Sequence, residues 1–387
     1  MAQAILARVV SCRPVRAPAE AFAMPPKARA KATIKAKATV KAKRGRPPAA
    51  KPPAVSVRRR PAAAGARPVG VIGDFFVDIQ ASVARLPAWN EDVESDAVEV
   101  LPGGSAANTA RQLAALLAER GQGVRFFGTR GDDLLGVAAL DRLHSQGFET
   151  AYLRCLKGVP SSVCMVLSGP DDRGFVSCYS SVKAQGPQHI NAAALRACAH
   201  VHIGGYMGVR GLHCEAFSEL LRSCRAGGAS LSLGTNSDPL LQWTGEGGHL
   251  RSMLPLVDLL FVNENELKGI SEAMGGSLHA LAPFLTVVET RGRDGCRLHF
   301  GMTKYYPPED VPTRVIEAPV DLTGAGDAFV AGFLARWVED RNARAAALWG
   351  NACGVCAVQR RGACPEPSPF SEVHREYESL SMPGPVT

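Results

Sequence analysis

The sequence predicts an α/β fold, in which a central and mostly parallel sheet is flanked by helices and accompanied by a smaller, separate β-sheet. Two observations support this prediction. Between 124 and 289, short apolar runs typical of buried strands alternate with longer helical runs, which is the pattern of βαβ units. Near 75–102 and 155–183, strand-like segments occur without intervening helices, and two of them flank the turn-rich stretch 169–174, as in a hairpin.

The elements follow from the spacing of apolar residues along the chain. Strands of the main sheet are expected at 69–74, 124–128, 201–204, 229–233, 259–262 and 285–289. Strands of the small sheet are expected at 97–101, 162–167 and 175–180. Helices are expected at 109–118, 134–144, 212–225, 264–271, 328–338 and 345–358. In such a fold, ligands bind at the carboxyl ends of the parallel strands.

Charge divides the chain into a basic tail and an acidic body. Seventeen of the 44 Lys and Arg residues lie in 1–67, with only one of the 36 acidic residues, so the tail carries about +16 and the remainder about −8. Residues 24–67 are rich in Lys, Ala and Pro and lack the apolar residues needed to offset chain entropy, so the tail is predicted to be disordered. Residues 1–23 have the composition of an organelle transit peptide, with a chloroplast favoured over a mitochondrion.

The tail also contains a short basic motif at 43–48, Lys-Arg-Gly-Arg-Pro-Pro, which resembles an AT-hook. An Arg-Gly-Arg-Pro core can lie in the narrow minor groove of A·T-rich DNA, so weak binding to such DNA is predicted. A solvated basic linker, or a continuation of the transit peptide, would have the same composition. No apolar run approaches the ~20 residues that a membrane-spanning helix needs, so no membrane association is expected.

The most informative segment is 321–327, Asp-Leu-Thr-Gly-Ala-Gly-Asp, ahead of the helix expected at 328–338. Its glycines leave backbone amides bare at the first turn, where the helix dipole also favours an anion. Asp327 adds a carboxylate beside this turn. An anion hole with a base at its edge suits phosphoryl transfer to a hydroxyl, whereas a glycine-rich turn with an Asp cap is the plain structural alternative.

A second segment, 102–108, Pro-Gly-Gly-Ser-Ala-Ala-Asn, precedes the helix expected at 109–118. Paired glycines let a ligand approach the backbone closely. Together the two segments resemble the signatures of the PfkB/ribokinase family of carbohydrate and nucleoside kinases, over about 68–373. The resemblance implies a ribokinase-like kinase domain over 68–380, in which the small sheet acts as a lid over the sugar.

The resemblance implies transfer of the ATP γ-phosphate to a primary hydroxyl of a sugar, with Asp327 as the base that takes the hydroxyl proton. The amides of the turn would stabilise the phosphoryl group; they belong to Gly324, Ala325, Gly326 and Asp327. The other hydroxyls of the sugar would be held by Asp78, Gly103, Gly104 and Asn108. A carboxylate can accept hydrogen bonds from two vicinal hydroxyls, and an Asn side chain both donates and accepts.

Three further groups of residues match motifs of the same family. Asn263 and Glu266, in Asn-Glu-Asn-Glu, would orient water bound to Mg²⁺. The nucleotide would lie against Thr290, Gly292, Gly295 and Asn351. A K⁺ ion would bind near Asp321, Thr323 and the loop 360–365. Leu322 replaces a commoner Thr, Ser181–Ala184 replaces a more polar run, and Gly234 stands where an Asp is frequent; these departures concern the substrate more than the reaction.

Two alternatives to a sugar kinase remain open from the sequence. A nucleoside kinase would perform the same chemistry with a base slot that the sequence does not locate. A non-catalytic family member could associate with an organellar nucleoid or its transcription machinery through the basic tail, although the intact motif residues favour catalysis. The remaining partner prediction is a homodimer formed through the lid.

Overall fold

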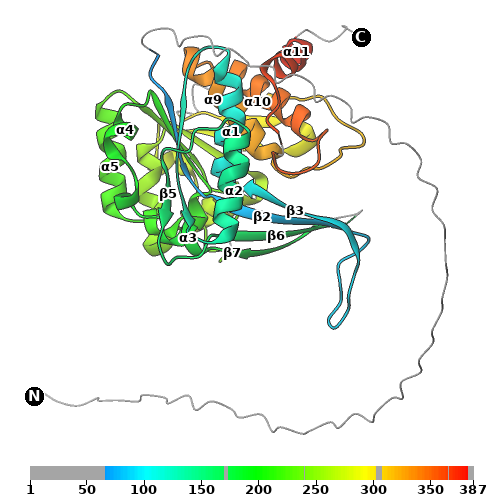
Figure 1. The fold of residues 1–387 in the computed structure, drawn as a ribbon. Coiled ribbons are helices and arrows are strands. Elements are labelled where there is room, and N and C mark those ends of the chain that lie inside the picture. The colour runs from blue at the N-terminus through cyan, green and yellow to red at the C-terminus, as the bar shows by residue number, and fades with distance from the viewer. Residues whose placement is uncertain (1–65, 170–172, 239, 302–306, 365, 382–387) are drawn as a thin grey trace, which may run out of the picture. The chain divides into compact units, whose positions relative to one another are not determined.

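The computed structural model describes residues 66–169, 173–238, 240–301, 307–364 and 366–381 (Figure 1). The predicted transit peptide and the AT-hook-like motif lie outside the described residues, as does Pro365 of the loop predicted to bind K⁺. None of the described helices is long and apolar enough to cross a membrane.

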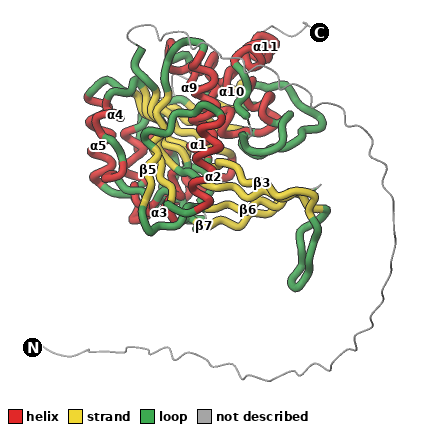
Figure 2. The backbone as a smooth tube through the Cα atoms, in the orientation of Figure 1, coloured by secondary structure: helices red, strands yellow, loops and turns green. Residues whose placement is uncertain are grey.

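The main sheet has nine strands within the described residues, in the order β13-β12-β11-β10-β9-β8-β1-β4-β5. Figure 2 shows strands of this sheet in yellow, with red helices on both sides of them. In this order the seven neighbouring strands from β11 to β5 run parallel to one another. Strands β12 and β13 extend the sheet beyond β11 with antiparallel pairing. The strands are β1 Val69–Gly73, β4 Val124–Gly131, β5 Leu153–Leu156, β8 His200–Gly204, β9 Ser230–Gly234, β10 Leu259–Asn263, β11 Thr286–Thr290, β12 Cys296–His299 and β13 Glu309–Val311. The predicted mostly parallel sheet is therefore confirmed.

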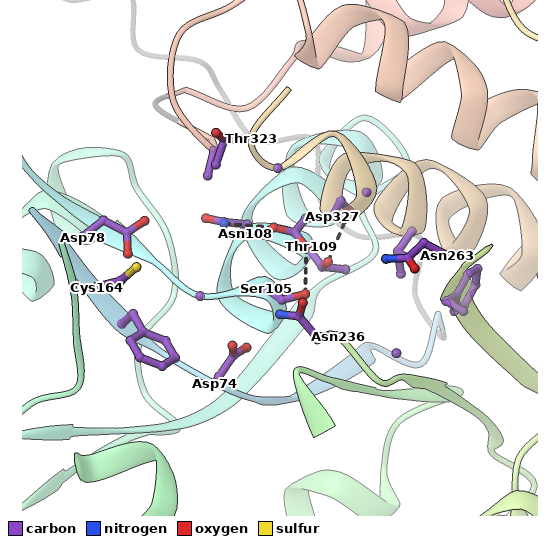
Figure 3. A pocket seen from close by; sticks show the side chains of 18 of the residues that line it. Asp74, Asp78, Ser105, Asn108, Thr109, Cys164, Asn236, Asn263, Thr323 and Asp327 are labelled. Atoms are coloured by element: carbon purple, nitrogen blue, oxygen red, sulfur yellow. Dashed lines mark hydrogen bonds between the residues drawn. The ribbon is translucent and has the colours of Figure 1, made fainter. Parts of the chain in front are cut away.

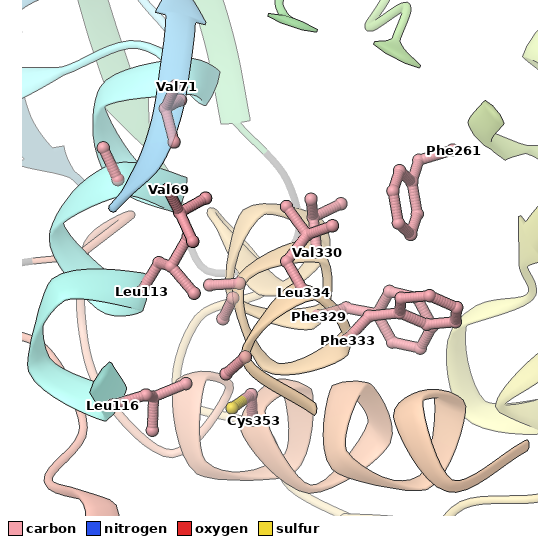
Figure 4. Packing of buried hydrophobic residues seen from close by; sticks show 14 of the residues in the cluster. Val69, Val71, Leu113, Leu116, Phe261, Phe329, Val330, Phe333, Leu334 and Cys353 are labelled. Carbon is pink, nitrogen blue, oxygen red and sulfur yellow. The ribbon is translucent and has the colours of Figure 1, made fainter. Parts of the chain in front are cut away.

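Helices cover both faces of the sheet because strand residues alternate between two apolar clusters. In β10, Leu259 and Phe261 face one cluster, whereas Leu260 and Val262 face the other. The first cluster is closed by α1, α9 and α10 (Figure 4) and the second mainly by α5. The helices are α1 Ser105–Ala118, α2 Leu134–Ser145, α3 Ser180–Ala184, α4 Ala192–Arg196, α5 Glu215–Ala226, α6 Leu250–Met253, α7 Glu264–Ala273, α8 Leu278–Leu281, α9 Ala325–Asp340, α10 Ala343–Ala357 and α11 Phe370–Ser381.

The small sheet, called the lid from here on, has the strand order β3-β2-β6-β7 and projects from the main body (Figure 1). Its strands are β2 Phe76–Val83, β3 Ser95–Gly103, β6 Val163–Ser168 and β7 Arg173–Cys178. Strand β2 pairs antiparallel with β3 and parallel with β6, and β6 pairs antiparallel with β7 as the predicted hairpin. One face of the lid lines a cavity, and the other exposes a set of apolar side chains, Val98, Val100, Met165 and Val176.

Three helix starts differ from the prediction by three residues or more. The helix expected at 109–118 begins at Ser105, because Gly104, at φ 99°, lets the chain turn directly from β3 into the helix. The helix expected at 328–338 begins at Ala325, because Gly324 adopts φ 75° and lets the chain turn directly into the helix. The helix expected at 212–225 begins at Glu215, because 210–212 form a separate 3₁₀ turn. Strand β2 was not predicted individually, although it lies within the segment 75–102 assigned to the small sheet, and β5, β12 and β13 were not predicted because they are short and carry little apolar periodicity.

Candidate active site

A cavity of about 480 Å³ lies between the lid and the carboxyl ends of β1, β8, β9 and β10 (Figure 3); we call it the lid cavity. This is the edge at which ligands bind in parallel sheets. Phe76, Asp78, Cys164 and Phe175 reach it from the lid, and the first turns of α1 and α9 close it from the opposite side.

Asp327 lies in the first turn of α9, and its carboxylate is held by the first turn of α1. Ser105 Oγ donates to Asp327 Oδ1 at 2.7 Å, and Asn108 Nδ2 donates to Oδ2 at 3.0 Å (Figure 3). The Thr109 hydroxyl donates to the Asp327 backbone carbonyl at 3.2 Å. Burial raises the pKa of Asp327 to about 7, against the two side-chain hydrogen bonds, which lower it. A carboxyl group that titrates near neutral pH is suited to act as a general base.

The two glycines in the turn ahead of Asp327 lie in different environments. Gly324 has φ 75°, and a Cβ atom there would lie 2.0 Å from the Ala363 carbonyl oxygen, so no other residue fits. Gly326 has open space where a Cβ would be, with no heavy atom within 4 Å. The Ala325 amide donates to Leu322 O at 3.3 Å, whereas the amides of Gly326 and Asp327, in the first turn of α9, have no backbone acceptor among the residues that the structure describes.

The residues predicted to hold the substrate come together around Asp78. A Cβ on Gly103 would lie 2.1 Å from Asp78 Oδ2, so this glycine is required by the Asp78 side chain on the neighbouring strand β2. Gly104, the residue before α1, has φ 99° and packs against the Asp74 carbonyl ahead of β2, so it too leaves no room for a side chain. Burial, followed by the negative charges of Asp74 and Asp327, raises the pKa of Asp78 to about 7. Asn108 lines the same cavity, but its amide nitrogen is bonded to Asp327, and its carbonyl oxygen is buried without a partner among the described residues.

Several cavity residues were missed by the sequence reasoning. Asp74 follows β1 and accepts a hydrogen bond from the Ala106 amide at 2.7 Å; burial raises its pKa. Its place directly after a buried strand was a signal that could have identified it. Ser105 had only its neighbouring motif as a signal. Asn236, in the left-handed region at φ 57°, and His202, in the middle of β8, also line the cavity and had no sequence signal of their own.

The two residues predicted to act on Mg²⁺-bound water form a capping box at the start of α7. The Asn263 side chain accepts from the Glu266 amide at 2.9 Å, while the Glu266 carboxylate accepts from the Asn263 backbone and side chain at 3.1 and 2.9 Å. Both residues line the lid cavity. Burial raises the pKa of Glu266. Their hard oxygen atoms suit the hydration shell of Mg²⁺, which usually keeps several waters.

A second cavity of about 560 Å³, the α10 cavity, lies between the β11–β12 turn and helices α9 and α10. It contains all the residues predicted to bind the nucleotide: Thr290, Gly292, Gly295 and Asn351. Asn351 Nδ2 donates to the backbone carbonyls of Val311 and Pro312, at 3.0 and 3.1 Å. The side chain thereby fixes on α10 the segment that leads into the cavity wall at 313–317. Gly326 lines both cavities, so they meet at the first turn of α9.

The residues predicted to bind K⁺ connect two loops through hydrogen bonds to the Asp321 carboxylate. The Asp321 carboxylate accepts from the Thr323 amide at 2.8 Å, the Thr323 hydroxyl at 2.6 Å and the Gly362 amide at 2.9 Å. These hydrogen bonds hold the 360–364 loop against the turn that contains Gly324.

Comparison with known proteins places this geometry in a family. A family model described as pfkB family carbohydrate kinase matches residues 67–369. The ATP-dependent ribose-1-phosphate kinase of Halopiger xanaduensis is 29% identical over 293 residues, covering 75% of this chain and 92% of that protein. The ribokinase of Bacillus subtilis is 27% identical over 312 residues, covering 79% and 99%.

Solved structures give the same fold. The ribokinase of Arabidopsis thaliana complexed with ribose and ATP has a TM-score of 0.65 at 21% identity and covers 81% of this chain and 99% of its own. The fructokinase of Xylella fastidiosa with bound ATP has a TM-score of 0.65 at 21% identity, with coverage of 82% and 99%.

A ribokinase fold with an acidic lid cavity and a glycine turn at a helix start defines a kinase of sugars or nucleosides. The chain belongs to the pfkB family of carbohydrate kinases, as its motifs predicted.

Proposed function

We propose that the protein transfers the γ-phosphoryl group of ATP to a primary hydroxyl of a sugar that carries no phosphate. The observation that carries this proposal is the position of Asp327 in the lid cavity, next to Gly326, where the two cavities meet, with its carboxylate fixed by Ser105 and Asn108. ATP would occupy the α10 cavity, and the sugar would occupy the lid cavity beside Asp78.

Each protein group then has one task in the reaction. Asp327 accepts the proton of the attacking hydroxyl as that oxygen bonds to the γ-phosphorus and the bond to the ADP oxygen breaks. The amides of Gly326 and Asp327 stabilise the charge on the transferring phosphoryl group. Asn263 and Glu266 would hold Mg²⁺ through water, and the ion would supply positive charge that offsets the charge of the phosphates. Asp78 accepts hydrogen bonds from the other hydroxyls of the sugar and fixes its position.

The charge of the lid cavity supports an acceptor without phosphate. Four carboxyl side chains line this cavity, and its described lining contains no lysine or arginine. A sugar phosphate would bring negative charge next to these groups without a cation to pair with it. The carboxyl groups are Asp74, Asp78, Glu266 and Asp327.

A nucleoside is the second candidate, because the lid cavity also has an aromatic side. Phe76 and Tyr179 pack edge to face, with ring centroids 5.1 Å apart, and the exposed Phe175 of the lid lines the same cavity. An aromatic wall of this kind can contact a planar base as well as the apolar face of a sugar.

A substrate panel on the full-length protein tests the acceptor class. With MgATP, unphosphorylated pentoses, hexoses or nucleosides should stimulate ADP release, whereas ribose 1-phosphate should give a kcat/KM at least about 10-fold lower, because its charge is unpaired in the acidic cavity. A preference for sugar phosphates would contradict the acceptor assignment. ADP release that no acceptor stimulates would instead favour the non-catalytic alternative.

We also propose K⁺ activation, supported by the hydrogen bond that the Asp321 carboxylate accepts from the Gly362 amide of the 360–364 loop. A K⁺ ion at the backbone carbonyls of these loops would stabilise the turn that carries the anion-binding amides. Activity at equal ionic strength should therefore be several-fold higher in K⁺ than in Na⁺ or in a large organic cation. Equal rates in the three salts would remove this proposal.

The remaining proposals concern the tail and the lid. Organelle import, to a chloroplast in preference to a mitochondrion, is tested by sequencing the N-terminus of the mature protein.

Weak A·T-preferring DNA binding is tested with a peptide of residues 24–67 on A·T and G·C duplexes, where equal affinity would reduce the motif to a charged linker. A homodimer through the exposed apolar face of the lid is tested by sedimentation of Val176→Asp, which should then be monomeric.

A further inference from the structure

Four polar side chains form a continuous hydrogen-bonded row between β8 and β9, inside the apolar core. His200 Nδ1 lies 2.6 Å from Ser230 Oγ, and His200 Nε2 lies 2.8 Å from Ser232 Oγ. Ser232 Oγ in turn lies 2.9 Å from His202 Nδ1. The four side chains are between 0% and 6% exposed. Such a row is expensive to bury unless every proton has an acceptor, so its direction can be worked out.

The row has two proton arrangements. If each serine donates to the following histidine, Ser230 donates to His200 Nδ1, His200 Nε2–H donates to Ser232, and Ser232 donates to His202 Nδ1. The three hydrogen bonds of the row are then made, and the one proton left over, on His202 Nε2, lies outside the row. In the reverse arrangement the Ser230 hydroxyl needs another acceptor, and within the described part of the chain it has none. Each arrangement therefore leaves one proton without a partner in the row, and the first is favoured because its free proton belongs to His202, which lines the lid cavity, where water or a ligand can accept it.

His202 Nε2 lies on the edge of the ring that faces the lid cavity. The Cε1 and Nε2 atoms lie 3.4 and 3.6 Å from the place where a Cβ on Gly234 would be, and both residues line that cavity. Nε2 has no hydrogen-bond partner among the residues that the structure describes. Burial lowers the pKa of His202 to about 3, so the ring stays neutral with a single proton.

The surroundings of His202 place it on the phosphoryl side of the cavity. Its ring packs edge to face on Phe261, with centroids 5.8 Å apart, and β10 leads from Phe261 to Asn263. Thr235, next to Gly234, donates from its hydroxyl to Glu266 Oε2 at 3.3 Å. The neighbours of His202, Phe261 and Gly234, therefore lie close in the chain to Asn263 and to the Thr235 that binds Glu266, which places His202 on the side of the cavity that carries the capping box.

We propose that His202 is a further site residue, whose Nε2–H donates a hydrogen bond to an oxygen of the transferring phosphoryl group, and that Ser232 and His200 are positioning residues that fix this proton on Nε2. The proposal rests on the proposed kinase function. The absence of a side chain at Gly234 leaves the imidazole edge open to the ligand.

Steady-state kinetics of His202→Leu and Gly234→Ala test this role. Loss of one donor to the phosphoryl group should lower kcat by about 10- to 100-fold in His202→Leu and change the acceptor KM little. His202→Gln, which keeps a donor, should recover part of the loss. Gly234→Ala keeps His202 but covers its edge at ordinary van der Waals distance, so it should also lower kcat while the melting temperature stays near that of the wild type. A kcat within twofold of wild type in both His202→Leu and Gly234→Ala would overturn the proposal.

The proton position can be measured without relying on turnover. In ¹⁵N spectra of histidine-labelled full-length protein, with His202 assigned by comparison with His202→Gln, the ring should be in the Nε2–H form. Adding Mg²⁺ with a non-hydrolysable ATP analogue should shift its Nε2 signal, and Ser232→Ala should remove the preference for one tautomer. An Nδ1–H ring in the wild type would overturn the proposal even in a protein with full kinase activity. An Nε2–H ring in a protein without kinase activity would support the direction of the row and contradict the proposed function alone.

Discussion

Asp327→Asn is expected to lower kcat by about 100- to 10,000-fold, because the amide can still accept hydrogen bonds but cannot take the hydroxyl proton. The wild-type rate should fall as the pH drops below about 7, where Asp327 becomes protonated, and the small residual rate of the variant should lack this dependence. Acceptor-stimulated ADP release measured from pH 5.5 to 9 tests both statements. A variant that keeps more than a tenth of the wild-type kcat would contradict the role of Asp327 as the base.

Stability separates this catalytic effect from misfolding. The pKa of Asp327 is raised in the folded protein from 3.8 to about 7, so the folded state favours the protonated form, and the ionised carboxylate reduces stability as the pH rises through this interval. Asparagine removes that charge. The melting temperature of Asp327→Asn at pH 8 should therefore equal or exceed that of the wild type, and a large decrease would mean that the activity was lost through unfolding.

The second large effect is expected from a matched pair of glycine substitutions in one turn. Gly324→Ala forces a side chain into the left-handed region and against the Ala363 carbonyl, so it should destabilise the fold by about 2 kcal/mol or more and abolish activity. Gly326→Ala meets no protein atom and lies in the first turn of α9, so its stability should be unchanged or higher by up to about 1 kcal/mol. Its methyl group would nevertheless stand where the two cavities meet, and kcat should fall by about 10-fold or more because the phosphoryl group can no longer approach the amides.

Thermal unfolding and kcat, measured together on both variants, test this pair. A Gly326→Ala protein with wild-type kcat would show that the phosphoryl group does not pass over this turn. Equal stability losses in the two variants would contradict the distinct environments of the two glycines.

The sequence predicted most of the main sheet because its central strands are continuous apolar runs separated by amphipathic helices. The antiparallel strands β12 and β13 escaped prediction because their few residues owe their conformation to pairing with β11 and with each other. The start of α9 was misplaced by three residues because the conformation of Gly324 is set by its contact with Ala363, which is distant in the chain.

The candidate site was predictable where a motif occupies consecutive positions. Asp327 and the glycines of its turn could be found in this way, and the structure brings Asp78 to the same cavity. Ser105 and His202 could not be found, because their relevance comes from contacts with chain segments far away in sequence. Ser105 reaches Asp327 only because α1 and α9 pack side by side, and His202 is oriented through a serine of the neighbouring strand.

The junction of α1 and α9 also makes the alignment of the carboxylate a property of the hydrophobic core. The hydrogen bonds from Ser105 and Asn108 join the first turns of two helices, and the relative position of those turns is set by the packing of Leu113, Val330 and Leu334 (Figure 4). A core residue that changes size shifts one helix against the other, and a shift smaller than an ångström already weakens hydrogen bonds of 2.7 and 3.0 Å. Catalytic rate in this protein can therefore be tuned, or lost, by substitutions that never touch a ligand, well before they are large enough to unfold the chain.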